Sequence, residues 1–149
     1  MADNTITVVG NVTRDPELKF LNSGQAALRL AVAVSRRWQN RQTQEWEEKT
    51  SFFDVSSYGP MAENAASSIV KGARVVVTGR MEQRSWETES GEKRNAFEIV
   101  ADEIAPSLRW ATAVVTRTPR AEGGSGYADR PALARTPEPT TYAFDEEPF

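Results

Sequence analysis

Aromatic and basic residues that could bind a polyanion gather between residues 28 and 58. In the middle of this stretch Arg36, Arg37 and Arg41 surround Trp38, and Trp46 lies further along. Indole rings can stack on nucleobases, and neighbouring arginines can neutralise phosphates. The pattern indicates a clamp for a flexible polyanion that carries flat bases. An ordinary β-hairpin with a solvated loop, its tryptophans folded back onto the domain, fits the same residues.

The segments on either side of this arginine-rich stretch must position it. Leu28, Leu30, Val32 and Val34 alternate with small or polar residues, which predicts a half-buried strand over residues 28–35. A second strand is expected over residues 50–58, with a polar arm between the two. Alternation in this second strand places Phe52, Asp54, Ser56 and Tyr58 on one side of the sheet. Two aromatic side chains therefore share a side.

A second hairpin is predicted over residues 74–101, with its turn at Ser90-Gly91. The same alternation places Arg80, Glu82, Arg84 and Trp86 on one side of its first strand, and Lys93 and Arg94 follow the turn. A tryptophan again stands beside arginines. Packing of Trp86 against a partner subunit is the alternative.

The remaining elements are short. We expect a strand from Thr5 to Val9 that ends at Gly10-Asn11, and another from Glu17 to Leu21. A helix is predicted to begin at Pro60 and to be capped by Gly72. Residues 104–116 could hold an extra strand.

Composition excludes several classes of protein. Cysteine and histidine are absent, which rules out disulfides, thiol nucleophiles, zinc fingers and histidine-based catalytic triads. Glu45, Glu47 and Glu48 lie in a polar stretch without metal-like spacing. We therefore predict no catalytic residue, no metal, no cofactor and no enzymatic activity. No signal region or membrane-length apolar run is evident, so a soluble, cytoplasmic protein is expected.

The excess negative charge is confined to the end of the chain. Residues 1–118 contain 15 basic and 15 acidic side chains, whereas residues 119–149 contain 3 and 6. The latter segment is also rich in proline and glycine, which predicts disorder. We expect a domain over residues 1–117, a flexible linker over 118–141 and an acidic partner-binding tip over 142–149. The tip ends in Asp145, Glu146, Glu147, Pro148 and Phe149.

Five or six strands, one helix and two long hairpins predict an all-β protein. The expected fold is a five-stranded OB barrel with one short helix between strands 3 and 4, long hairpin arms and a disordered C-terminal tail. OB barrels bind oligonucleotides on one strand face and in the connecting loops.

Three motifs in this order resemble the bacterial single-stranded DNA-binding protein family. They are TITVVGNVTRDPELKF near the start, GARVVVTGRMEQRSWETESGEKRNAFEIVADEI in the second half and DEEPF at the end. The resemblance implies sequence-independent binding and protection of single-stranded DNA in replication, recombination and repair. It further implies a homotetramer, association with the nucleoid, recruitment of replication and repair proteins by the tip, and a strand at residues 108–117 that clasps a neighbouring subunit.

The resemblance also assigns roles to single residues. Bases would stack on Trp38, Phe52, Tyr58 and Trp86. Arg84 matches a basic position of the family. Together with the charge pattern of the two arms, this gives seven candidate phosphate contacts: Arg36, Arg37, Arg41, Arg80, Arg84, Lys93 and Arg94. Glu82 and Asp54 stand on the expected binding face where basic residues would be expected, and they should weaken phosphate contact locally.

Other readings stay open. One is an OB-fold protein–protein adaptor that has lost its nucleic-acid face, for which Trp38 and Trp86 would be dispensable. Another is a primosomal or transformation-specific paralogue. A cold-shock-like RNA-binding domain is a third, and the long arms, the helix and the acidic terminus argue against it.

Overall fold

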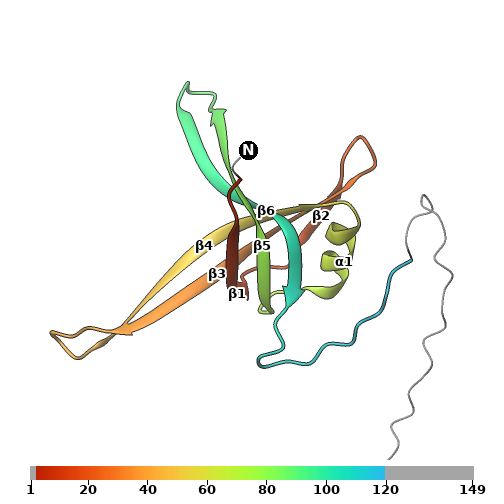
Figure 1. Ribbon diagram of the computed structural model, residues 1–149. Coiled ribbons are helices and arrows are strands. Elements are labelled where there is room, and N and C mark those ends of the chain that lie inside the picture. Colours follow the sequence, from red (N-terminus) through yellow and green to blue (C-terminus); the bar gives the residue numbers. More distant parts are fainter. Residues whose placement is uncertain (1–2, 120–149) are drawn as a thin grey trace, which may run out of the picture. The chain divides into compact units, whose positions relative to one another are not determined.

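The computed structural model describes residues 3–119 (Figure 1). Along the chain lie β1 (Ile6–Val12), β2 (Glu17–Phe20), β3 (Ala26–Gln39), β4 (Trp46–Tyr58), α1 (Pro60–Ser68), β5 (Arg74–Glu87) and β6 (Lys93–Pro106). Within this part of the chain, no helix is long and apolar enough to cross a bilayer. The acidic tip and most of the predicted linker lie outside the described residues.

Five strands close into a barrel. The order of pairing is β1–β5–β6–β4–β3, and β1 also pairs with β3, which completes the ring. β4 and β6 run parallel, and the other neighbours are antiparallel. β2 pairs with β3 alongside the barrel, and α1 connects β4 to β5, the third and fourth strands of the ring. The predicted five-stranded OB barrel with one short helix is confirmed.

The core consists of the aliphatic side chains that the alternation predicted. Leu28, Leu30 and Val32 of β3 are almost completely buried, as are Val75 and Val77 of β5. Each buried side chain of this size contributes about 1.5–3 kcal/mol to stability. Because one side of every strand is committed to this core, the side chains on the other side point away from it.

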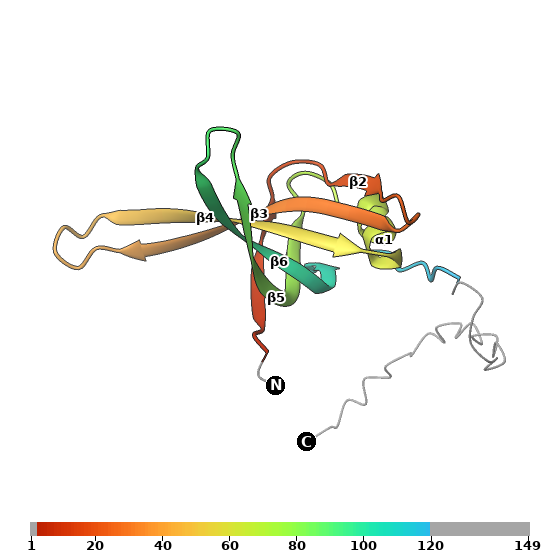
Figure 2. The same cartoon turned by 90° about the horizontal axis from the view of Figure 1, so that it is seen from above.

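Two hairpins extend well beyond the barrel. They leave the body in different directions, and α1 lies apart from both (Figures 1 and 2). The β3–β4 arm is longer and more regular than predicted, because its ladder continues past Ser35 to the pair formed by Gln39 and Trp46. The side chains of Ser35 and Thr50 hydrogen-bond across it at 2.9 Å. The expected polar loop is therefore a two-stranded ribbon with a short turn.

Asn40 forms that turn. Its backbone N–H donates to the carbonyl oxygen of Glu45 at 2.8 Å, and its side-chain oxygen accepts the N–H of Gln42 at 2.9 Å. Gln44 completes the reversal with a φ of 60°, a left-handed conformation that is uncommon outside glycine. These contacts fix the register of the whole arm.

Gly10 does not end its strand as predicted. A β-carbon at this position would lie 2.3 Å from the carbonyl oxygen of Ala33, so the backbone of β1 crosses β3 here at a distance that only glycine permits. The glycine is required for closing the barrel, and β1 continues through it to Val12.

The predicted helix end was also wrong. α1 ends at Ser68, with Ile69 in an extended conformation, and Gly72 lies beyond it in a separate turn. Gly72 has a φ of 87°, and its N–H donates to the carbonyl oxygen of Val12 at 2.7 Å. The glycine therefore connects the turn to β1 instead of capping the helix.

The extra strand considered for residues 104–116 is not formed. β6 includes residues 104–106, and residues 107–119 have no regular secondary structure. Val114 and Val115 are almost fully exposed. A β-prone segment forms a strand only when it pairs with another, and residues 107–119 pair with no strand in the described part of this chain.

Candidate nucleic-acid interface

The side of the sheet that faces away from the core carries exposed aromatic rings. We call this side the outer face: Phe52, Asp54, Ser56 and Tyr58 on β4 with Arg80, Glu82, Arg84 and Trp86 on β5. Phe52 is 71% exposed and Tyr58 is 44% exposed. Their cross-strand partners on β3 are Ala33 and Ala27. Because an alanine cannot cover an aromatic ring, both rings are left open to stacking.

The β5–β6 arm brings Trp86 to the same face. A hollow of about 200 Å³ is lined by Arg84 and Trp86 from β5 and by Asp54 from β4. Trp86 stands opposite Arg94 and is 47% exposed. The structure therefore brings Trp86 and Arg84 to the strand that carries Phe52 and Tyr58.

Trp38 lies on the other side of its arm. The register pairs Phe52 with Ala33 and Trp38 with Glu47, which places Trp38 on the core side of β3. Since the arm has left the barrel at that point, this side is open to solvent. Trp38 lines a second hollow, of about 400 Å³, with Arg36, Lys49 and Ser51.

The predicted phosphate contacts are distributed over both arms. Arg36 is beside Trp38, and Arg41 lies in the turn of the β3–β4 arm. Arg37 lies on the opposite side from Arg36, with its guanidinium 5.0 Å from the centre of the Trp46 ring. At the tip of the β5–β6 arm Lys93 pairs with Glu87 in the ladder. Arg94 forms an ion pair with Glu92 at 3.5 Å.

Carboxylates compensate much of the positive charge on the outer face. Arg80 donates a hydrogen bond to Glu82 at 2.7 Å, and this contact and the charge of Glu82 raise the pKa of Arg80. Arg84 lies 3.8 Å from Glu98.

Asp54, Glu98 and Glu82 are successive neighbours across β4, β6 and β5, so three carboxylates form a row through the outer face. Glu82 and Asp54, the two acids expected to weaken phosphate contact, are therefore joined by a third, Glu98. Exposed aromatic area, rather than a strongly positive potential, distinguishes this face.

Three features of the site were missed in the sequence. Arg14, Arg29 and Phe97 line the hollow around Trp86. Arg29 could have been found, because it alternates with Leu28 and Leu30 onto the outer face. Phe97 pairs with Gln83, and it is 60% exposed because it has passed the end of the barrel.

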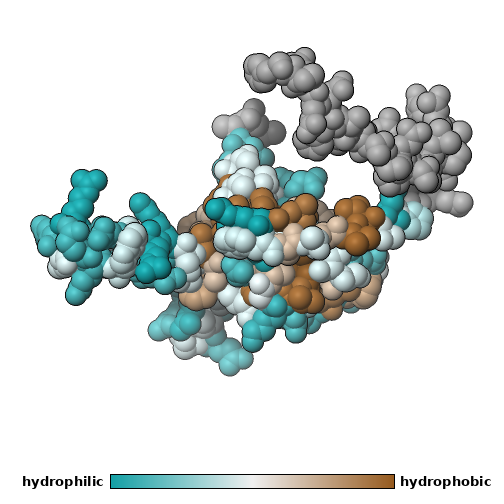
Figure 3. Space-filling model, turned by 90° about the horizontal axis from the view of Figure 1, so that it is seen from below, coloured by the Kyte–Doolittle hydropathy of each residue, from teal (hydrophilic) through white to brown (hydrophobic). Residues whose placement is uncertain are grey.

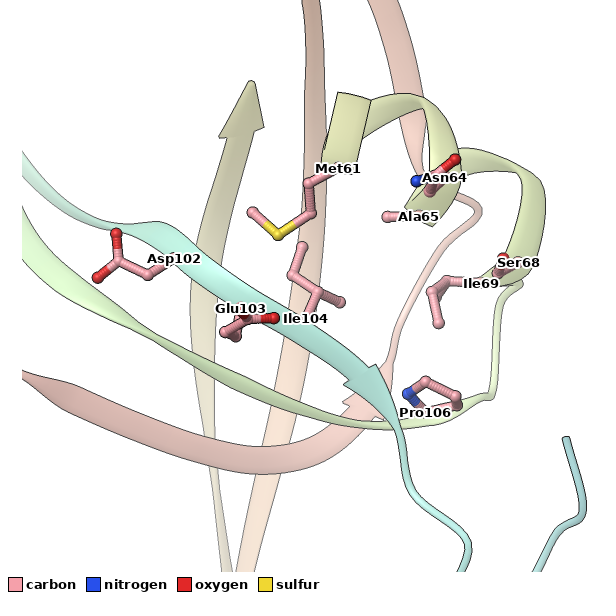
Figure 4. A pocket seen from close by; sticks show the side chains of 9 residues that line it. All are labelled: Met61, Asn64, Ala65, Ser68, Ile69, Asp102, Glu103, Ile104 and Pro106. Carbon is pink, nitrogen blue, oxygen red and sulfur yellow. The ribbon is translucent and has the colours of Figure 1, made fainter. Parts of the chain in front are cut away.

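A larger hollow beside α1 has the wrong charge for a polyanion. It measures about 470 Å³, and its lining includes Met61 of the helix and Ile104 of β6 (Figure 4). Asp102 and Glu103 add two carboxylates, and among the described residues that line it none is basic. Among residues 3–119 there is also no cluster of three or more potential metal-ligating side chains.

Comparison with known proteins agrees with this geometry. A model of the single-strand binding protein family matches residues 3–107. The single-stranded DNA-binding protein of Mycobacterium tuberculosis is 50% identical over 135 residues, which cover 90% of this chain and 82% of that protein.

Solved structures show the same likeness. A Plasmodium falciparum SSB in complex with ssDNA aligns with a TM-score of 0.66 at 25% identity, covering 72% of this chain and 97% of that chain. A small single-stranded DNA-binding protein from Streptomyces coelicolor aligns with a TM-score of 0.61 at 32% identity, with the same coverage. These matches confirm the family resemblance seen in the sequence. They also confirm the prediction of a DNA-binding protein rather than an enzyme, since the family is one of binding proteins. The chain belongs to the single-strand binding protein family.

Proposed function

We propose that this chain coats single-stranded DNA without regard to sequence and protects it during replication, recombination and repair. The observation that carries the proposal is the pair of uncovered rings, Phe52 and Tyr58, on the same face as Trp86. Bases would stack on these rings and on Trp38. Every base has a π-face, so such binding tolerates any sequence.

Phosphates would contact the seven basic residues of the two arms and the outer face: Arg36, Arg37, Arg41, Arg80, Arg84, Lys93 and Arg94. Arg80, Arg84 and Arg94 already have carboxylate partners, so their contribution would be smaller than that of the other four. Stacking would therefore supply a large share of the affinity, and binding would persist at moderate salt.

Substitution of Trp86 by alanine tests the stacking surface. Loss of one base–aromatic stack is worth about 1–3 kcal/mol, so affinity for oligo(dT) should fall roughly 5- to 150-fold. The control is Val70→Ala, which truncates another exposed apolar side chain: Val70 is 60% exposed and lies between α1 and β5, outside the outer face and both arms. Equal affinities of Trp86→Ala and wild type would refute the role of Trp86.

The adaptor alternative is tested with the double variant Trp38→Ala, Trp86→Ala. If DNA coating is the function, this variant loses tight binding to oligo(dT) and fails to support replication in cells. An adaptor would retain its cellular function without these rings.

A chain that coats DNA should be associated with the nucleoid. Fluorescence microscopy of the tagged chain tests this, and an even distribution through the cell would contradict it.

We propose that residues 142–149 recruit replication and repair proteins. The segment combines Asp145, Glu146 and Glu147 with an apolar Pro148-Phe149 pair. A basic pocket with an apolar floor on a partner would capture such a peptide. Deletion of residues 142–149 should abolish capture of replication proteins and leave affinity for oligo(dT) intact. A deletion variant that captures the same proteins would refute this role.

A homotetramer is proposed on the strength of the family and of exposed apolar side chains outside the binding face. Phe20, Leu108 and Trp110 are each more than 60% exposed. Such surfaces commonly lie in subunit contacts. Residues 108–117, free of secondary structure in one chain, would clasp a neighbouring subunit. Light scattering should give four times the 16.5 kDa chain mass, and a monomeric mass would contradict the proposal.

A further inference from the structure

Trp46 continues the aromatic row of β4 onto the β3–β4 arm. Even-numbered residues of β4 share one side of the strand, so Trp46 belongs to the same side as Phe52 and Tyr58. The three aromatic residues recur at intervals of six residues, or about 20 Å each at the usual strand rise of about 3.3 Å. The right-handed twist of the ribbon turns this row gradually around the arm.

The ring of Trp46 is available. It is 60% exposed, and its cross-strand partner, Gln39, directs its side-chain amide to the backbone oxygen of Gln44 at 3.0 Å. All three rings in the row therefore stand opposite side chains that leave them uncovered: Ala27, Ala33 and Gln39. The same arrangement, an aromatic ring opposite a side chain that does not cover it, therefore occurs three times along β4.

Arg37 adds a positive charge beside the Trp46 ring, so that a base and its phosphate could both be bound there. Its guanidinium lies 5.0 Å from the centre of the Trp46 ring, on the same side of the ribbon. A cation over one ring face orients the indole and leaves the opposite face for a base. The guanidinium of Arg37 would then be close to the phosphate of the nucleotide whose base stacks on Trp46. Trp38, Arg36 and Lys49 form a comparable group on the other side of the arm.

The surroundings of Trp46 favour a nucleic acid over a protein partner. The β3–β4 arm, at the left in Figure 3, is coloured hydrophilic to neutral, whereas the hydrophobic patches of this view lie on the body. Protein interfaces of any stability are built around an apolar centre. A single aromatic ring beside a cation on a polar ribbon is instead suited to a stacked base.

We propose that Trp46, oriented by Arg37, is an additional base-stacking position for single-stranded DNA on the side of the arm opposite Trp38. The inference rests on the proposed function and deepens it, since it gives Trp46 a stacking role that the family resemblance did not assign. A strand bound along Tyr58 and Phe52 would continue to Trp46 on the arm.

A full-length variant with Trp46 as its only tryptophan tests this directly. Trp38, Trp86 and Trp110 are replaced by phenylalanine, and binding of labelled oligo(dT) is followed by anisotropy while intrinsic fluorescence is recorded. The matched control keeps only Trp110, which is exposed and stacked on Arg74 but lies outside the outer face. We expect bound DNA to quench Trp46 and to leave Trp110 unchanged.

Bound oligonucleotide without quenching of Trp46 would overturn the inference, and so would equal quenching of Trp46 and Trp110. As a second measurement, Trp46→Ala in the otherwise wild-type chain should weaken binding of a long oligo(dT) roughly 5- to 150-fold, with Trp46→Phe recovering much of the loss. Wild-type affinity in Trp46→Ala would also overturn it. A wild-type chain that failed to bind oligo(dT) would refute the proposed function instead.

Discussion

Removing the carboxylate of Glu82 should make DNA binding more salt-dependent. Glu82 holds the guanidinium of Arg80 at 2.7 Å on the outer face and, with Asp54 and Glu98, forms a row of negative charge. In Glu82→Gln the Arg80 side chain loses its ionic partner and becomes free to contact a phosphate. Both side chains lie at the surface, 42% and 47% exposed, so the ion pair contributes little to stability and the unfolding midpoint should change little.

The magnitude follows from counterion release. Each phosphate neutralised on a single strand steepens the plot of log affinity against log salt by about 0.7. With one additional contact, the ratio of the affinity of Glu82→Gln to that of wild type should be about 2.6 times larger at 50 mM salt than at 200 mM salt. Anisotropy of labelled oligo(dT) at four or more salt concentrations is sufficient to measure this.

The control must remove one negative charge elsewhere. Glu103→Gln does so, because Glu103 lines the hollow beside α1 and not the outer face. A general change in net charge would affect both variants equally, whereas release of Arg80 affects only Glu82→Gln. Identical salt slopes for Glu82→Gln and Glu103→Gln would refute the reasoning.

Two other predictions concern stability and protonation. Gly10→Ala places a β-carbon 2.3 Å from the carbonyl oxygen of Ala33 and should lower the free energy of unfolding by about 1–3 kcal/mol. Urea denaturation measures this, and an unchanged midpoint would contradict the close crossing of β1 and β3. The hydrogen bond and charge of Lys19 lower the pKa of Glu17, so this pair stabilises the fold above the unfolded-state pKa, and the contribution is lost as pH falls through the folded-state pKa. In an NMR titration, Lys19→Met should raise the pKa of Glu17 towards its ordinary value, and an unmoved pKa would argue against the contact.

Local alternation was sufficient to predict the barrel strands and the shared side of Phe52 and Tyr58. It works there because one side of each strand is buried, so a register slip would expose Leu30 or Val32. The same rule could not show that Gly10 lies against Ala33, since that contact joins strands far apart in the sequence.

The arms were harder to predict than the barrel. Beyond the barrel neither side of a ribbon is buried, so residue pattern no longer identifies a face. The opposite placement of Trp38 and Trp46 depends on the register set by the Asn40 turn, and the exposure of Phe97 depends on where the barrel ends. The ion pairs of Arg80 and Arg84 likewise depend on side-chain conformation rather than on spacing.

The central claim is that exposed aromatic rings on the outer face and arms bind unpaired bases. The most direct test is quenching of wild-type tryptophan fluorescence by oligo(dT), at low and high salt, with duplex DNA of equal charge as competitor. The account predicts strong quenching that persists at high salt and is not displaced by duplex, because paired bases cannot stack on the rings. Binding without quenching, or binding that modest salt abolishes and duplex displaces, would contradict it.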